Sequence, residues 1–161
     1  KFADKLFLNN LYSDMTYEYI RGLIEGEGCF TFCPGNYMKN GRKVKIPAFA
    51  IAMHERDENL IKKVRDFLGL KNRVYNYKSS ESDGSKRGRK AILIVRDYNQ
   101  LKEIIVPLCY RKFNGFKGRQ FEEWMEEISS DPDVSQRFKF IHQLYKNGFY
   151  DREIRFLKYN L

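Results

Sequence analysis

One nine-residue segment, residues 20–28, breaks the local rules of helix formation and most constrains the fold. Its apolar residues Ile20 and Ile24 recur at helical spacing. Gly22 and Gly26 lie on one face of the same helix, where each glycine costs about 1 kcal/mol relative to alanine. Small residues at this spacing let two helix backbones approach closely. The sequence therefore predicts a helix that packs tightly against another helix.

The same segment carries two acidic residues at the wrong end of the helix. Glu25 and Glu27 lie at the C-terminus, where the helix dipole is negative and each carboxylate costs about 0.3–1 kcal/mol. A sequence that violates a local preference without visible compensation marks a candidate functional site. Carboxylates beside free carbonyls form an oxygen-rich site that suits Mg²⁺ or Ca²⁺. We expect a divalent cation there.

The remaining patterns predict an α+β domain in the order α-β-β-α-β-β-α, with extra C-terminal helices. Two hairpins indicate one four-stranded antiparallel, saddle-like sheet with helices on one face. We interpret the chain as a single domain, and Asp131 with Pro132 predicts the start of a helix in its tail. The expected parts are an N-terminal arm at 1–15, a core at 16–128 and a C-terminal helical extension at 129–161.

The charge balance predicts a polyanionic partner. The chain has 30 Lys and Arg against 21 Asp and Glu, a net charge of +9, and nucleic acid is the first class of partner to expect. No apolar run approaches the ~20 residues that span a bilayer, so we expect no membrane partner. The cysteines number three, an odd count without a CxxC pair, which argues against a disulfide framework and for an intracellular protein.

Residues 20–28 resemble the defining motif of the LAGLIDADG homing endonucleases, with glutamate at both acidic positions. The surroundings agree with this resemblance. An aromatic strand follows the motif, Pro47 to Ile51 precede an Asp-capped helix, and residues 117–124 are similar to the family's closing Lys-x-x-x-Phe-x-x-Trp helix. The resemblance covers about residues 17–128 and leaves the tail outside.

The resemblance implies a metal-dependent endonuclease that cuts double-stranded DNA. Glu27 matches the metal ligand, and Gly26 the residue whose carbonyl assists. Gly22, Gly26, Glu25 and Leu23 match the interface between two motif helices. Only one copy of the motif is present, so the resemblance implies a homodimer on a long, pseudo-palindromic site. The implied cofactor is Mg²⁺, with Ca²⁺ or Mn²⁺ as substitutes that support binding.

The resemblance also assigns groups near the scissile phosphate. Lys117 matches a basic catalytic residue, with Lys112 and Arg119 as alternatives because the register of 111–118 is uncertain. The family often has a polar residue, commonly Gln, that positions water at the end of the second strand. Met53 stands there instead, beside His54. Either His54 takes that role or the waters are organised otherwise, and His54 could also be purely structural.

The uncovered sheet face is expected to lie in the major groove, where basic and polar side chains contact bases and phosphates. The candidates for DNA binding are Tyr37, Lys39, Arg42, Lys45, Arg73, Tyr75, Tyr77, Lys78, Lys86, Arg87, Arg89 and Lys90.

Other interpretations stay open at this point. A maturase would bind its host intron RNA without cutting, and a regulator would bind a palindrome without cutting. Gly22 and Gly26 could instead fit a crowded monomer core, and Glu25, Glu27 and Lys117 could be ordinary surface charges. The family resemblance implies a protein encoded within a group I intron, in an organelle (chloroplast or mitochondrion) or a prokaryotic cytoplasm.

Overall fold

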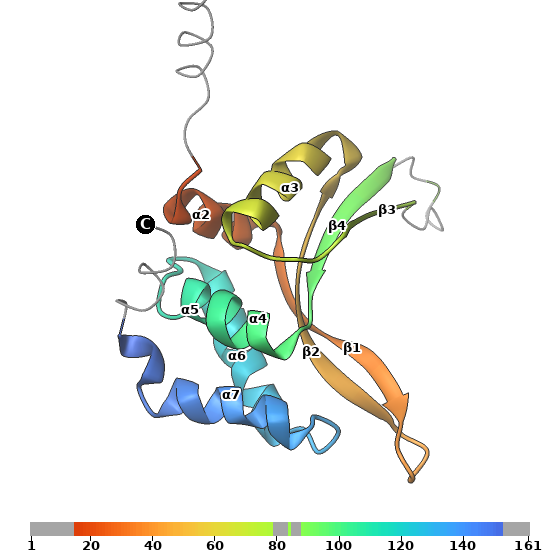
Figure 1. Ribbon diagram of the computed structural model, residues 1–161, viewed down its shortest axis with the longest axis vertical. Helices are drawn as coiled ribbons and strands as arrows, with labels where there is room; N and C mark the ends of the chain where they lie inside the picture. The colour runs from red at the N-terminus through yellow and green to blue at the C-terminus, as the bar shows by residue number, and fades with distance from the viewer. Residues whose placement is uncertain (1–14, 79–83, 85–87, 153–161) are drawn as a thin grey trace, which may run out of the picture.

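The computed structural model describes residues 15–78, 84 and 88–152. Four strands form one antiparallel sheet in the order β1-β2-β4-β3 (Figure 1). This confirms the predicted α+β class and the predicted sheet. The strands are β1 (Gly28–Tyr37), β2 (Lys43–His54), β3 (Val74–Lys78) and β4 (Arg89–Val95).

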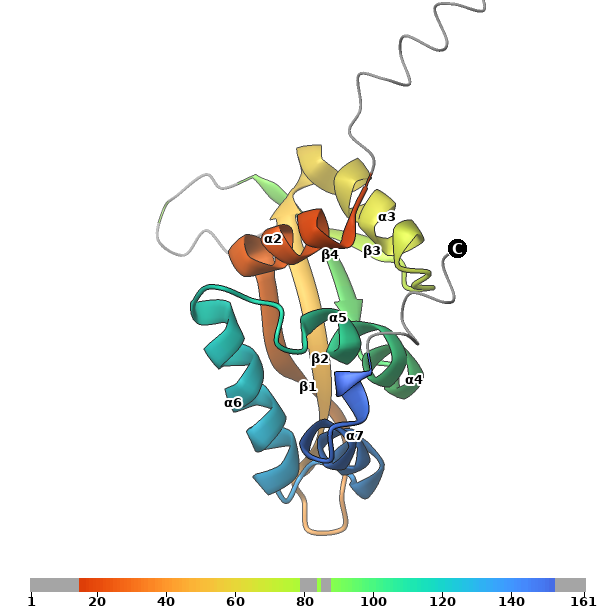
Figure 2. The ribbon, with the colours of Figure 1, turned by 90° about the vertical axis from the view of Figure 1, so that its left-hand side faces the viewer.

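The helices lie on one side of this sheet, as the sequence predicted (Figures 1 and 2). The motif helix α2 crosses the sheet near one end, and α6 runs beside edge strand β1 (Figure 2). The helices are α2 (Tyr17–Glu27), α3 (Glu58–Phe67), α4 (Tyr98–Gln100), α5 (Val106–Cys109), α6 (Phe116–Ser130) and α7 (Gln136–Lys146), with a π-helical turn, η2 (Leu101–Ile105), between α4 and α5.

Alternation along the strands separates a helix-covered face from an uncovered one. Phe49 and Ile51 of β2 point to the helices and are fully buried, together with Ile20 and Ile24 of α2. Phe30 of β1 lies on the same face, opposite Phe49. Its ring centroid lies 5.3 Å from that of Phe121 and 5.3 Å from that of Trp124, both in α6. These contacts fix α6 and α2 against the same sheet.

The sequence carries two turn signals for the first hairpin, Pro34–Asn36 and Asn40 with Gly41, and the turn forms at the second. The residues Pro34–Asn36 do not form the turn but continue β1 through an irregularity in register between Pro34 and Tyr37. The turn lies further on, where Met38 N–H donates to Arg42 O at 2.7 Å. Pro47 is tolerated because β2 pairs with β4 only from Phe49 onward, so β2 is an edge at Pro47.

The predicted helix start at Asp131 and Pro132 is wrong. Asp131 is the C-cap of α6, and α7 begins only at Gln136. The segment between the helices lies along the open edge of β2 instead: Lys45 N–H donates to Asp133 O at 3.0 Å, and Lys45 forms a parallel bridge with Val134. Pairing with a strand 86 or more residues away overrides the local capping preference.

Among the described residues, no helix combines the length and the apolar character needed to cross a membrane. Residues 1–14 of the expected N-terminal arm and residues 153–161 of the expected C-terminal extension lie outside the described part of the chain. The division of the chain at 16 and 128 stays a prediction.

Candidate active site

The two glycines of α2 lie on an open face of the helix. A Cβ built on Gly22 or Gly26 meets no heavy atom within 4 Å beyond its own helix backbone. Gly28 differs, because its Cβ would lie 2.6 Å from the Ile24 side chain. The crowded monomer core considered above is therefore wrong for Gly22 and Gly26. Leu23, the other apolar interface candidate, is half-buried against the core.

Glu25 is compensated within the chain. Its carboxylate accepts a hydrogen bond from Asn114 N–H at 2.8 Å and from Gly115 N–H at 2.6 Å. These groups immediately precede α6, where the positive end of a helix dipole favours an anion. The carboxylate therefore holds the start of α6 against the end of α2, and its unfavourable place in its own helix is offset without a ligand.

Glu27 has no such compensation. Its side chain is exposed, and no hydrogen bond or ion pair reaches its carboxylate from the described residues. The described residues contain no group of three or more His, Cys, Asp or Glu side chains placed to hold a metal ion. The described residues therefore place one carboxylate, that of Glu27, at this end of α2, with the carbonyl of Gly26 preceding it.

Lys117 reaches the backbone at the C-terminal end of the motif helix. Its ammonium group donates to Gly28 O at 2.7 Å, one residue after Glu27. Trp124, on the same helix, donates from Nε1 to Thr31 O at 2.9 Å. Side chains of α6 therefore satisfy carbonyls of edge strand β1 and bring a cation to the C-terminal end of α2. Of the three basic candidates, Lys117 is the one that the structure places next to the motif.

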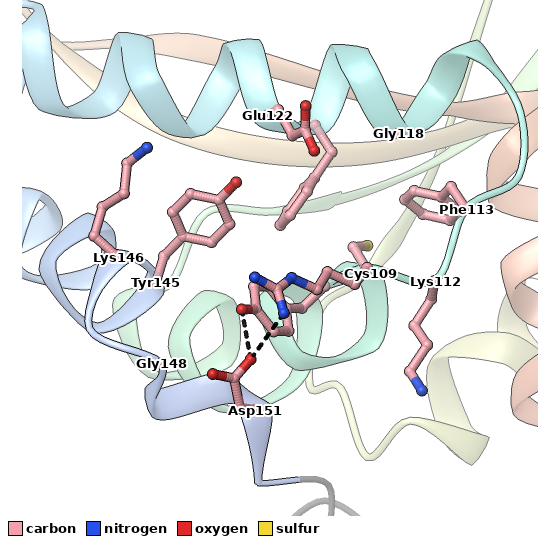
Figure 3. A pocket seen from close by; sticks show the side chains of 12 residues that line it. Cys109, Lys112, Phe113, Gly118, Glu122, Tyr145, Lys146, Gly148 and Asp151 are labelled. Atoms are coloured by element: carbon pink, nitrogen blue, oxygen red, sulfur yellow. Dashed lines mark hydrogen bonds and ion pairs between the residues drawn. The ribbon is translucent and has the colours of Figure 1, made fainter.

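The two alternative cations lie elsewhere. Arg119 is exposed and donates to Glu123 at 2.8 Å, one turn along α6. Lys112 lines a cavity of about 290 Å³ between the loop after α5, α6 and α7 (Figure 3). There Tyr110 Oη donates to Asp151 at 2.7 Å, and neither Glu27 nor Lys117 lines that cavity.

Met53 and His54 point to opposite faces of β2. Met53 is half-buried and packs against the core beneath the helices. His54 is exposed, and its Nδ1 accepts from Arg56 N–H at 3.2 Å, which caps a short 3₁₀ turn. A thioether cannot position water as an amide does. Neither assignment to water positioning is tested by this geometry, and both stay predictions.

Two of the predicted DNA-binding cations are engaged by the segment between α6 and α7. Arg42 donates to Asp133 at 2.6 Å, and Lys45 donates to Asp131 at 2.5 Å. The Lys45 ammonium lowers the pKa of the Asp131 carboxyl through this hydrogen bond. Glu127 lies 3.7 Å from Lys45 as well. Both cations are therefore largely neutralised within the protein. No sequence signal pairs these residues, because the partners are so distant along the chain.

The other candidates fall into two groups. At the hairpin tip, Tyr37 is 72% exposed and Lys39 is exposed. At the far end of the sheet, the guanidinium of Arg73 lies 5.6 Å from the ring centroid of Tyr75. The same region holds Tyr77, Lys78, Lys90 and Arg89, whose Nε lies 3.8 Å from Glu55. Lys86 and Arg87 lie outside the described residues.

The described residues form an α+β domain whose motif helix ends in a free carboxylate, with the Lys117 ammonium bound to the carbonyl of the next residue and one face of the sheet left uncovered. The sequence profile of the family described as LAGLIDADG endonuclease matches residues 20–128, more than half of the chain. The chain therefore belongs to the LAGLIDADG endonuclease family, which confirms the resemblance seen in the sequence.

Solved structures share the fold. I-LtrWI, a LAGLIDADG homing endonuclease bound to target DNA, is 22% identical with a TM-score of 0.59 over 85% of this chain and 45% of its own. I-GzeII, in complex with its DNA target, is 21% identical with a TM-score of 0.54 over 84% and 44%. I-TnaI, a homing endonuclease, is 21% identical with a TM-score of 0.57 over 92% and 100%. The chain thus spans less than half of the first two proteins and all of the third.

Proposed function

We propose that this protein is a sequence-specific endonuclease that cuts both strands of a long, pseudo-palindromic DNA site by metal-dependent phosphodiester hydrolysis, as a homodimer. The observation that carries the proposal is the state of Glu27. Its carboxylate is exposed and unpaired among the described residues, at the end of an open glycine face, and Lys117 donates to the carbonyl of the next residue, Gly28. A carboxylate in that place costs folding free energy, and a bound cation offsets the cost.

The homodimer is supported by the open face of α2. Gly22 and Gly26 give up helix stability without relieving any contact in this chain. A second motif helix packed on this face accounts for that loss, and symmetry then places two Glu27 carboxylates close together. I-TnaI, which this chain covers over its whole length, supports a functional unit of this size.

The donors at the site fit Mg²⁺. Carboxylate and main-chain carbonyl oxygens are the hard ligands that Mg²⁺ prefers, and Glu27 with the Gly26 carbonyl would hold it. When bound, the ion supplies positive charge that activates water and stabilises the leaving oxygen at the phosphodiester. Calcium is present in a structure of the relative I-SmaMI bound to uncleaved DNA.

The residues of this chain have separate tasks in the proposed reaction. Glu27 holds negative charge against the cation, while Glu25 fixes the start of α6. That anchor positions Lys117, whose ammonium adds positive charge where the pentacovalent phosphorus develops charge in the transition state. The basic surface supplies the remaining attraction for the duplex, and it predicts affinity that falls steeply with salt.

The test is cleavage of a randomised duplex library in Mg²⁺ and in Ca²⁺, with the ends sequenced. We expect enrichment of one long site that is cut in Mg²⁺. E27Q removes the charge and keeps the size, so cleavage is expected to disappear while specific binding persists. The matched control is E18Q, at an exposed position in the first turn of the same helix. Retained cleavage by E27Q would refute the metal-ligand assignment, and binding without cutting by the wild-type protein would favour a maturase or a regulator.

A further inference from the structure

The sheet face that the helices leave uncovered is apolar at its centre. The strand register identifies the positions that point away from the helices, because Phe30, Phe49 and Leu93 point toward them. The uncovered positions of the three longer strands are Cys29, Thr31 and Cys33 in β1, Val44, Ile46, Ala48, Ala50 and Ala52 in β2, and Ile92 and Ile94 in β4. We call these ten residues the apolar saddle.

The apolar saddle is a surface and not an extension of the core. Cys29 is exposed, and Ile46, Ile92 and Ile94 are half-buried although no described helix packs on them. Ala48 and Ala50 are buried between their longer neighbours. A contiguous apolar surface of this kind marks a site of interaction.

The side chains of the apolar saddle cannot read bases by strong hydrogen bonds. Thr31 has the one hydroxyl group, and the two thiols are weak donors. Discrimination of guanine or adenine in the major groove depends on bidentate Arg, Lys, Asn or Gln side chains, and none stands at these ten positions.

Polar and cationic groups border this surface at both ends. Tyr75, Tyr77 and Lys90 lie on the same uncovered face at the β3–β4 end, opposite Ile92 and His54 in the register. Tyr37 and Lys39 lie at the hairpin tip. A net charge of +9 with cations at the borders complements a polyanion that crosses the sheet, and it disfavours an apolar protein partner.

We infer that the apolar saddle recognises duplex DNA by packing against the methyl groups of thymines, so that the central part of each half-site is rich in thymine. The inference rests on the proposed function. Thymine carries the apolar group of the major groove, and small aliphatic side chains contact it. Isoleucines 46, 92 and 94 are the largest side chains of the surface and provide most of the contact area. The hydrogen-bonded readout is confined to the borders.

The test replaces thymine by uracil in the selected site. This substitution removes the methyl group and keeps every hydrogen-bonding group of the base pair. Binding is measured in EDTA buffer, so that the duplex stays intact, with one thymine replaced at a time. We expect Kd to rise about fourfold for each contacted methyl group, from the transfer free energy of one methylene. The affected thymines should form a contiguous block inside each half-site.

Two variants assign this effect to the surface. I46T and I94T keep a β-branched side chain and place a hydroxyl in the apolar saddle. We expect each to reduce the thymine-to-uracil ratio of affinities toward one at a subset of positions. The reverse variant T31V adds a methyl group to the same surface and should keep or increase that ratio. Thermal unfolding confirms that each variant is folded.

The outcomes separate this inference from the proposed function. A selected site that binds equally well with uracil at every position, or whose centre is G·C, overturns the thymine recognition and leaves the endonuclease proposal standing. A library from which no sequence is enriched overturns both. Loss of the thymine preference in I46T or I94T, with unchanged binding of unselected DNA, supports the inference.

Discussion

Replacing both glycines of α2 by alanine should change two measured quantities in opposite directions. The double variant G22A/G26A adds two methyl groups to a helix face where neither meets an atom within 4 Å. Each replacement should raise the free energy of unfolding of the isolated subunit by about 1 kcal/mol, because alanine is the better helix former. Together they should contribute about 2 kcal/mol.

The same methyl groups should weaken the proposed dimer, since glycine is what permits close approach of the two backbones. Urea unfolding at a concentration low enough to keep the protein monomeric measures the first quantity, and sedimentation equilibrium across a dilution series measures the second. G22L is the more severe form of the same change. Unaltered self-association in G22A/G26A would refute the interface, and a lower subunit stability would refute the open face.

Three further predictions concern the supports of the site. E25A loses two hydrogen bonds to a charged acceptor and should lower the free energy of unfolding in urea by about 1.5–3 kcal/mol. E25Q should lie between E25A and the wild-type protein. A decrease of less than about 0.5 kcal/mol in E25A would contradict the role of Glu25 as an anchor for α6. Lys45 lowers the pKa of the Asp131 carboxyl, so the ionised carboxylate stabilises the fold above about pH 4. This stabilisation is lost as the pH falls through the lowered pKa. D131N should therefore reduce the loss of folded protein at acid pH in a titration followed by circular dichroism. Burial raises the pKa of the Tyr150 hydroxyl, which donates to Lys102 O at 2.9 Å. The neutral hydroxyl therefore contributes fully to stability below about pH 10, and the contribution is lost as the pH rises through the raised pKa. Y150F should lose less stability than the wild-type protein in an alkaline titration, and equal losses would contradict this role of the hydroxyl.

Local sequence signals predicted those helices whose start is specified by residues within the helix itself. Thr16 caps α2 through a hydrogen bond from Tyr19 N–H, and Asp97 accepts from Gln100 N–H, each at the three-residue spacing typical of a helix N-cap. The anomaly of residues 20–28 located the candidate site because glycine and glutamate there conflict with the helix itself. Composition and charge predicted the class of partner but no residue of the interface.

Long-range pairings were beyond the reach of the sequence. Nothing local connects Glu25 with the backbone before α6, so the two glutamates looked equivalent until the structure separated them. The same holds for Lys45, whose ammonium group donates to Asp131, while its predicted contact with DNA stays a prediction. The face of each strand residue also depended on the register around Pro47, and the register is a property of two strands together.

The segment from Asp131 to Val134 also protects β2 from pairing with a strand of another molecule. Where β2 runs past the end of β4, its outer edge would otherwise present unpaired backbone groups, the usual template for strand-to-strand aggregation. The bridge from Val134 and the hydrogen bond from Lys45 N–H to Asp133 O occupy that edge. Ion pairs of Asp131 with Lys45 and of Asp133 with Arg42 hold the segment in place. A chain that ends at Ser130 would keep Gly26, Glu27 and Lys117 but expose this edge, and we expect it to aggregate at a lower concentration than the full chain.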